Sequence, residues 1–229
     1  MRAPASREPM RIVLLGAPGA GKGTQCKRIV NRYGLQHLSS GDILRGQRAA
    51  GTELGKKASG FMDSGALVPD QIIIEMMIDE IKKAPIAGFI LDGFPRTVNQ
   101  AIELDKALAR CEQEIDTILN LQIDDQVVAE RMTGRRSCPK CGAVYHIENL
   151  KPKVDEICNN DGTKLIQRPD DSPEVVANRL KTYHRQTKPV LDYYKNNPGA
   201  REIYDIDANK NADEVSTLIF ERLDVLARA

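Results

Sequence analysis

Residues 12–24 read Ile12-Val13-Leu14-Leu15-Gly16-Ala17-Pro18-Gly19-Ala20-Gly21-Lys22-Gly23-Thr24, an apolar run that leads into a glycine-rich segment. This order predicts a buried strand, a loop and a helix that begins near Gly21. Glycines allow successive backbone N–H groups to point inward, and the helix N-terminus adds partial positive charge. Lys22 is then placed to reach the outer phosphates of a nucleotide. The agreement of strand, spacing and lysine favours a phosphate-binding loop over an ordinary turn.

The residue after the lysine separates this loop from the common pattern. Most phosphate loops continue with Ser or Thr, whose hydroxyl binds magnesium, whereas Gly23 stands here and Thr24 follows one place later. This difference weakens the case for a switch GTPase or a motor ATPase. The run from Gly16 to Gln25 closely resembles the phosphate loop of adenylate kinases, a family that carries glycine at this place. The resemblance implies an ATP-binding loop made of Gly19, Ala20, Gly21, Lys22, Gly23 and Thr24.

The 229 residues are enough for one large domain, or for one domain with insertions. Because 33 basic and 32 acidic residues leave a net charge of +1, we expect no nucleic-acid or membrane partner. No apolar stretch approaches the roughly 18 residues of a membrane span. Residues 1–9 lack an apolar signal core, which argues against secretion and favours a tail or a start at Met10.

The alternation of apolar runs and amphipathic segments predicts an α/β fold with a five-stranded parallel sheet flanked by helices. Glycine-rich small helices are expected from Ser39 to Val68. A helix that begins after Ser172 should end or kink at Pro189. The other expected strands are 36–38, 88–92, 117–123 and 201–206, and the other expected helices are 69–83, 97–111, 126–133 and 212–228.

Asp92 ends the apolar run that begins at Gly88. The C-terminal ends of parallel strands face the ligand crevice, so we expect Asp92 on the same edge of the sheet as the phosphate loop. The alternative for Asp92 alone is a helix or turn cap, and the segment Gly93-Phe94-Pro95-Arg96 that follows favours the functional interpretation. His37 is interpreted as a packed or surface histidine rather than a catalyst.

Five cysteines are an odd number, and three of them lie between residues 138 and 158. This distribution indicates metal binding and a reducing cytoplasm rather than a disulfide framework. Two residues separate Cys138 from Cys141, and two residues separate Cys158 from Asp161. Sixteen residues lie between the two pairs. Two such knuckles can close a tetrahedral zinc site, and a segment from 134 to 169 is too short to bury its own core. The alternative is that Asp161 is a turn residue; we favour its role as a ligand of the metal.

Seven cations are expected near the crevice, mostly just beyond the ends of helices and strands: Lys22, Arg45, Arg96, Arg131, Arg135, Arg168 and Arg179. Such a cluster suits two polyphosphates, because phosphoryl transfer depends on positioning and on neutralisation of spread charge, with magnesium assisting. The sequence offers no convincing general base. A nucleoside monophosphate acceptor explains this, since its phosphate oxygen is already ionised.

The resemblance to adenylate kinases extends to Leu91-Asp92-Gly93-Phe94-Pro95-Arg96 and to Arg168-Pro169-Asp170-Asp171, and it runs from Met10 nearly to the C-terminus. It implies a P-loop core with two mobile insertions, one over AMP and one a lid over ATP. The implied boundaries are 10–38, 69–133 and 171–229 for the core, 39–68 for the AMP-binding insertion, 134–170 for the lid and 1–9 for a tail.

The same resemblance implies the role of each site residue. AMP would contact Ser40, Arg45, Leu67, Val68, Gly93, Arg96, Gln100, Arg168 and Arg179. ATP would contact the loop together with Arg131, Val144, Tyr145 and Lys210, while Arg135, Arg168 and Arg179 bridge phosphates. Catalysis would rest on Lys22, Asp92, Arg96, Arg131, Arg135, Arg168 and Arg179. Ser40 stands where many members have threonine and keeps the hydroxyl. Some bacterial lids hold zinc with three cysteines and an aspartate, which Cys138, Cys141, Cys158 and Asp161 match.

The implied activity is reversible, Mg²⁺-dependent phosphoryl transfer from ATP to AMP that gives two ADP, in a cytoplasmic monomer with structural Zn²⁺. Three alternatives stay open. A GTP-dependent switch would explain Asn209-Lys210, but Ala212 stands where its aspartate should be. A zinc-ribbon nucleic-acid binder would need exposed aromatic and basic faces; in this segment Tyr145 is the only aromatic residue, and Glu148, Asp155, Glu156 and Asp161 balance the basic residues. A kinase for UMP or CMP is the nearest alternative, against which Gln100 and the long insertion argue by resemblance only.

Overall fold

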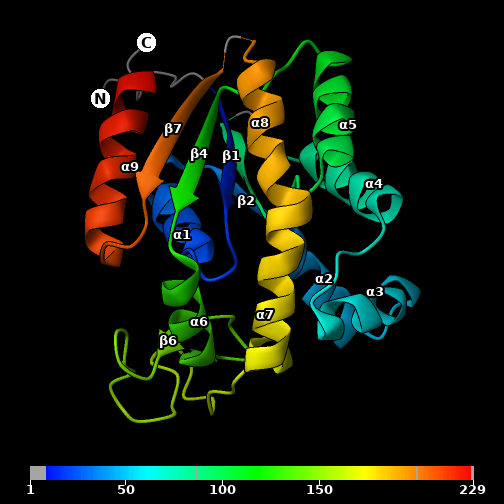
Figure 1. Cartoon of the computed structure of the whole chain (residues 1–229). Helices are drawn as coiled ribbons and strands as arrows, with labels where there is room; N and C mark the ends of the chain where they lie inside the picture. The colour runs from blue at the N-terminus through cyan, green and yellow to red at the C-terminus, as the bar shows by residue number, and fades with distance from the viewer. Residues whose placement is uncertain (1–8, 86, 200, 228–229) are drawn as a thin grey trace, which may run out of the picture.

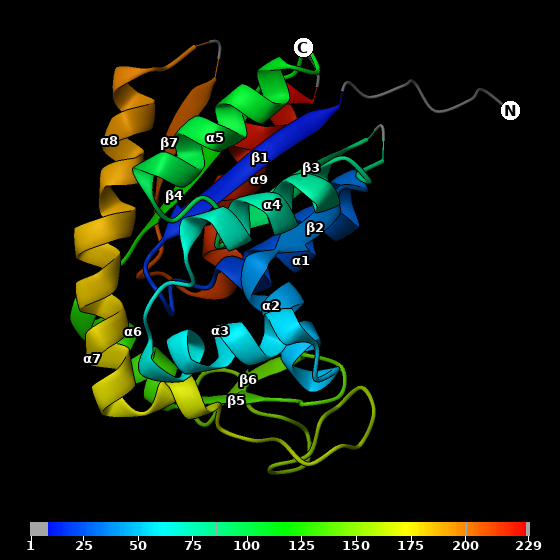
Figure 2. The same cartoon turned by 90° about the vertical axis from the view of Figure 1, so that its right-hand side faces the viewer.

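The computed structural model describes residues 9–85, 87–199 and 201–227; most of the expected tail, residues 1–8, lies outside them. Its central feature is a parallel sheet in the order β2-β3-β1-β4-β7 (Figures 1 and 2). The strands are β1 (Met10–Gly16), β2 (Gln36–Ser39), β3 (Gly88–Asp92), β4 (Thr117–Gln122) and β7 (Glu202–Asp207). The predicted five-stranded parallel sheet is therefore confirmed, and the strand that leads into the glycine-rich loop is its central strand.

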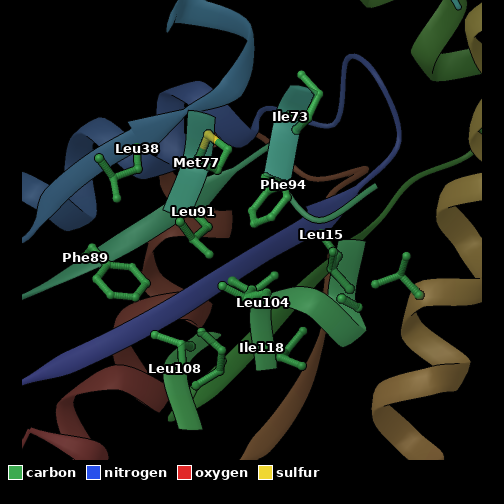
Figure 3. Close-up of a cluster of buried hydrophobic side chains, with 14 of the residues drawn as sticks. Leu15, Leu38, Ile73, Met77, Phe89, Leu91, Phe94, Leu104, Leu108 and Ile118 are labelled. Carbon is green, nitrogen blue, oxygen red and sulfur yellow. The ribbon is translucent and has the colours of Figure 1, made fainter. Parts of the chain in front are cut away.

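Alternation along β1 divides its side chains between the two faces of the sheet. Ile12 and Leu14 pack with α1 (Lys22–Tyr33) and α9 (Ala212–Leu226). Val13 and Leu15 belong to the opposite core, which includes residues of three helices (Figure 3). These helices are α4 (Asp70–Ile81), α5 (Val98–Ala109) and α8 (Lys188–Asn196). Because both faces are covered, β1 is buried along most of its length, as a continuous apolar run predicts.

Two segments stand beyond the C-terminal edge of the sheet (Figure 2). The first contains α2 (Ser40–Ala49) and α3 (Glu53–Ser64), which confirms the small helices expected there. The second follows α6 (Asp125–Thr133) and contains the antiparallel pair β5 (Arg135–Ser137) and β6 (Val144–His146). It ends in the short turn η1 (Pro169–Asp171), which contacts α3. Both segments therefore lie on the edge to which the glycine-rich loop belongs.

The long helical stretch that Ser172 caps is interrupted earlier than the sequence predicts. α7 (Pro173–Thr182) passes into a π-helical segment, η2 (Tyr183–Thr187), and then into α8. The N–H of Lys188 donates to the carbonyl of Tyr183. Pro189 has no N–H and its ring crowds the carbonyl four residues before it, and a widened turn relieves both problems. The proline thus changes the helix on its N-terminal side, and the stretch continues beyond it.

Candidate active site

A cleft lies where β1, α2 and α7 meet at the C-terminal edge of the sheet. Its charged lining residues are four cations, Lys22, Arg45, Arg96 and Arg179, and one carboxylate, Asp170. Among the described residues, no histidine, glutamate or cysteine lines it. Such a lining attracts polyanions, and its one carboxylate, Asp170, is paired with Arg179.

The glycine-rich loop closes around Lys22, the first residue of α1. The Lys22 ammonium donates to the carbonyl oxygens of Gly16 at 2.7 Å and Ala17 at 2.8 Å. Gly19 has φ of +77°, and a Cβ there would lie 2.9 Å from Met132 Cγ, so the turn requires glycine. Burial lowers the pKa of Lys22 to about 8, against the opposing effect of the Asp92 carboxylate.

Arg96 is held beside the loop by the turn that follows β3. Its Nε donates to the carbonyl of Gly93 at 2.8 Å, and Ser40 Oγ donates to the same carbonyl at 2.6 Å. Gly93 has φ of +72°, a conformation that favours glycine, and a Cβ there would lie 2.7 Å from Arg96 Nη2. Gln100 is buried and accepts from the Arg96 N–H at 2.8 Å while it donates to Asp70 at 2.7 Å. Asp70 was not anticipated, because nothing in its spacing connects it with Gln100.

Two of the remaining arginines, Arg135 and Arg179, are paired with the carboxylates of η1. Arg135 forms a bidentate pair with Asp171, which is fully buried. Arg179 pairs with Asp170 and lies 3.7 Å from Asp171. Arg168 donates to Ser137 Oγ at 2.9 Å. Burial lowers the pKa of Arg168 and of Arg179 to about 10. The sequence analysis predicts no role for Asp170 and Asp171 beyond the motif Arg168–Asp171; the neighbouring opposite charges were the signal for their pairing.

The expected nucleotide-binding residues separate into two groups in the structure. Most of those expected at AMP line the cleft with Lys22: Ser40, Arg45, Leu67, Val68, Gly93, Arg96, Gln100 and Arg179. Apart from Lys22, those expected at ATP lie outside this lining: Gly19, Ala20, Gly21, Gly23, Thr24, Arg131, Val144, Tyr145 and Lys210. Arg131 and Lys210 do meet, because Arg131 donates to the carbonyls of Ala208 at 2.9 Å and Lys210 at 3.1 Å. These bonds connect the end of α6 with the loop before α9.

The predicted metal ligands Cys138, Cys141, Cys158 and Asp161 come together, with one donor atom of each within 4.8 Å of the others. Cys138 Sγ lies 3.5 Å from both carboxylate oxygens of Asp161, and Cys141 Sγ lies 3.5 Å from Cys158 Sγ. Tetrahedral zinc at ordinary bond lengths separates sulfur from oxygen by about 3.5 Å and two sulfurs by about 3.8 Å. The donor set therefore fits zinc in both chemistry and spacing.

Tyr145 faces this cysteine cluster. Its side chain is buried, and its hydroxyl accepts from the Asn159 N–H at 2.8 Å and lies 3.5 Å from Cys158 Sγ. The neighbouring thiol of Cys158 raises the pKa of the Tyr145 hydroxyl. The family resemblance implies that Tyr145 contacts ATP; the orientation of its hydroxyl toward the sulfur was not expected.

A phosphate loop on the central strand of a parallel sheet, open to a cleft of arginines, belongs to the P-loop nucleotide kinases. The family model described as adenylate kinase matches residues 14–198. An adenylate kinase of Lachnospira eligens is 46% identical over 93% of this chain and its own whole length. One of Staphylococcus epidermidis is 44% identical over 95% of this chain and all of its own.

A third relative, the adenylate kinase of Caldicellulosiruptor saccharolyticus, is 50% identical over 82% of this chain and 87% of its own. The chain therefore belongs to the adenylate kinase family. It is an enzyme, a nucleotide-binding phosphotransferase of the nucleoside monophosphate kinase class, which confirms the predicted family and class. Within the described residues, each helix is too short or too polar to cross a bilayer.

Proposed function

We propose that the protein transfers a phosphoryl group reversibly between ATP and AMP, with two ADP as the products. The observation that carries this proposal is the charge of the cleft, in which four cations face one carboxylate that is already paired with Arg179. Two nucleotides bring several phosphate charges close together, and a lining of this sign offsets their repulsion. Family membership supports adenine as the base.

The reaction needs no general base. An ionised phosphate oxygen of AMP attacks the γ-phosphorus of ATP, and the bond from that phosphorus to the β,γ-bridging oxygen breaks, so ADP leaves with the electron pair. Lys22, Arg96 and Arg179 hold the phosphates in line and stabilise the charge that spreads over the transferring group. Arg131, Arg135 and Arg168 would join them when the second segment closes.

Magnesium would enter with ATP and neutralise part of the charge on its phosphates. Asp92 is the carboxylate that would hold it, because its Oδ2 lies 3.8 Å from the place a Cβ on Gly23 would occupy. This oxygen therefore stands beside the phosphate loop without a residue between them.

We also propose that residues 39–68 close over AMP and residues 134–170 over ATP, on a core of residues 10–38, 69–133 and 171–229. The η1 pairs support this, since Asp170 and Asp171 supply Arg179 and Arg135 with carboxylates that phosphates can replace. Closure of both segments excludes water and so suppresses ATP hydrolysis. Opening of the lid then limits turnover.

Zinc in the lid is part of the proposal, with Cys138, Cys141, Cys158 and Asp161 as ligands. Around them the described residues form a small core of Ala143, Tyr145 and Leu165 with two of the cysteines. A core of this size does not stabilise a fold without a metal ion or a disulfide, so the role of the zinc ion is structural. The described cysteines form no disulfide, which supports a reducing compartment such as the cytoplasm.

The test is a coupled assay with magnesium, ATP and one monophosphate at a time. AMP should be used in clear preference to UMP, CMP and GMP, and chelation of magnesium should abolish turnover. Arg96→Ala should lower kcat by about 10²–10³-fold with an unchanged fold, the loss typical of one preorganised charge-stabilising group. Lys181→Ala, which removes an exposed cation of α7, is the matched control and should keep normal rates. ATP hydrolysis that ignores added AMP would refute the proposal.

A further inference from the structure

Three side chains with metal-ligating atoms, those of Cys26, His37 and Asp92, lie behind the phosphate loop. Of these, only Asp92 has a part in the transfer described above. Cys26 Sγ, His37 and Asp92 each offer one ligand atom within 4.8 Å of the other two. His37 Nε2 lies 3.3 Å from Asp92 Oδ2. The three residues come from α1, β2 and β3, so the cluster exists only in the folded core.

Strand periodicity explains why the three meet. Ile90 packs on the α1 side of the sheet, and Asp92, two residues later, shares that side. Leu35 also packs there, so His37 on β2 points the same way, next to Asp92 in the register that pairs Ser39 with Asp92. α1 packs against β3 and presents the fully buried Cys26.

Cys26 also stands one helical turn after Lys22. Residues four apart share a helix face, so the thiol and the lysine of the phosphate loop both face Asp92. The cluster is therefore adjacent to the loop, and any ligand that moves Asp92 or α1 acts directly on the phosphate site.

The donor set of one thiol, one imidazole and one carboxylate suits a thiophilic divalent cation much better than magnesium, which prefers oxygen alone. Tetrahedral zinc separates its nitrogen and oxygen ligands by about 3.3 Å, which matches the His37–Asp92 distance of 3.3 Å. Zinc or cadmium would replace the thiol proton of Cys26 and leave one position for water or phosphate.

We propose that Cys26, His37 and Asp92 form an inhibitory site for thiophilic divalent cations such as Zn²⁺ and Cd²⁺, separate from the lid. Its inhibitory effect rests on the proposed function, since the cation takes Asp92 from magnesium and crowds Lys22. Inhibition should accordingly weaken as Mg·ATP rises. The lid site and this site differ in role: one cation stabilises the fold and the other stops turnover.

The experiment uses the full chain and cadmium, which reports its thiolate bonds by ultraviolet charge-transfer absorption. The wild type should bind one more cadmium ion per chain than Cys26→Ala, with added charge-transfer absorption and at least about tenfold inhibition that a chelator reverses. His37→Gln should keep the fold, because the side chain is partly exposed, and should weaken the second ion by about tenfold or more. Cys111→Ala removes an exposed cysteine and serves as the control that keeps both ions.

The outcomes separate this proposal from the others. Equal cadmium stoichiometry in the wild type, Cys26→Ala and His37→Gln would overturn the site. If the lid holds no metal, the difference of one ion between wild type and Cys26→Ala still decides the question. If the protein proves inactive toward AMP, the stoichiometry and the absorption still test the site. Should Cys26→Ala fold poorly, Cys26→Ser and His37→Gln carry the comparison.

Discussion

The hydroxyl of Tyr145 lies 3.5 Å from the sulfur of Cys158, and it already accepts the backbone N–H of Asn159. Its own proton is therefore free to point at the sulfur. Three thiolates and a carboxylate give a zinc site a net charge of −2, and an O–H donor to one thiolate reduces the repulsion among the ligands.

We expect Tyr145→Phe to release zinc to a chelator roughly tenfold faster than the wild type, the lower end of the range for outer hydrogen bonds at metal sites. KM for ATP should stay the same, because the hydroxyl faces the cysteines. Competition with a zinc-binding dye measures the release rate. Tyr193→Phe, which loses a hydroxyl bond to Asp105 far from the lid, is the control. A raised KM with unchanged zinc release would instead assign Tyr145 to ATP.

Asp161 should tolerate replacement by cysteine better than by alanine. Asp161→Cys keeps four anionic ligands and adds a softer donor, so the lid should hold zinc more tightly and resist heat better. Asp161→Ala should weaken retention, but less than Cys158→Ala, because three thiolates remain. Metal analysis after dialysis against a chelator measures this. Equal retention in Asp161→Ala and the wild type would remove the aspartate from the site.

Lys22 should take up a proton when ATP binds at alkaline pH. Its pKa of about 8 in the free enzyme means that the ammonium is partly lost above pH 8. Phosphate oxygens favour the charged form, so binding at about pH 9 should be coupled to proton uptake. Calorimetry in two buffers with different ionisation enthalpies counts the protons, and Lys22→Arg should show none. Uptake that persists in Lys22→Arg would contradict the assignment.

The lowered pKa of Lys22 also determines how this residue makes the stability of the protein depend on pH. Between about pH 8 and its unfolded value of 10.5, the unfolded chain binds more protons at this residue than the folded one. The free energy of unfolding therefore rises with pH across that window through Lys22. Denaturation curves for the wild type and Lys22→Arg at each end of the window isolate this slope.

Asp171→Ala should lower the free energy of unfolding far more than the loss of a surface ion pair does. Asp171 is fully buried, and its loss leaves the Arg135 guanidinium without its carboxylate. Removing one partner of a buried pair costs about 3–5 kcal/mol in free energy of unfolding. Asp63→Ala breaks the exposed pair with Arg48 and should cost under about 1 kcal/mol. Similar melting temperatures for the two variants would contradict the buried-pair interpretation.

Much of the fold follows from local pattern. The apolar run from Ile12 to Leu15 predicted the central strand, and the glycines after it predicted the loop and the start of α1. The cluster of Cys138, Cys141, Cys158 and Asp161 was also predictable, because the two-residue gap within each pair is a local property of a knuckle. In each case the residues that make the structure are neighbours in the sequence.

Contacts between distant residues could not be predicted in this way. Asp70 reaches Gln100 across 30 positions, and Cys26 meets His37 and Asp92 only because the sheet order places β3 between β2 and β1. Tyr145 was assigned by resemblance to ATP, and its rotation toward Cys158 depends on how the lid packs. For Pro189 the sequence marks the proline but not the widened turn, since the carbonyl that needs relief lies four residues earlier.

The π-helical segment η2 determines how far α8 is rotated about the helix axis relative to α7. An α-helix turns about 100° per residue, so deletion of one residue between Tyr183 and Thr187 would rotate Arg179 by about that angle relative to Val190 and Tyr194. Either the arginine would leave the cleft, or the two core residues would leave the sheet. The length of this segment is therefore under tighter constraint than its two exposed side chains, His184 and Arg185, where substitution is tolerated better than deletion.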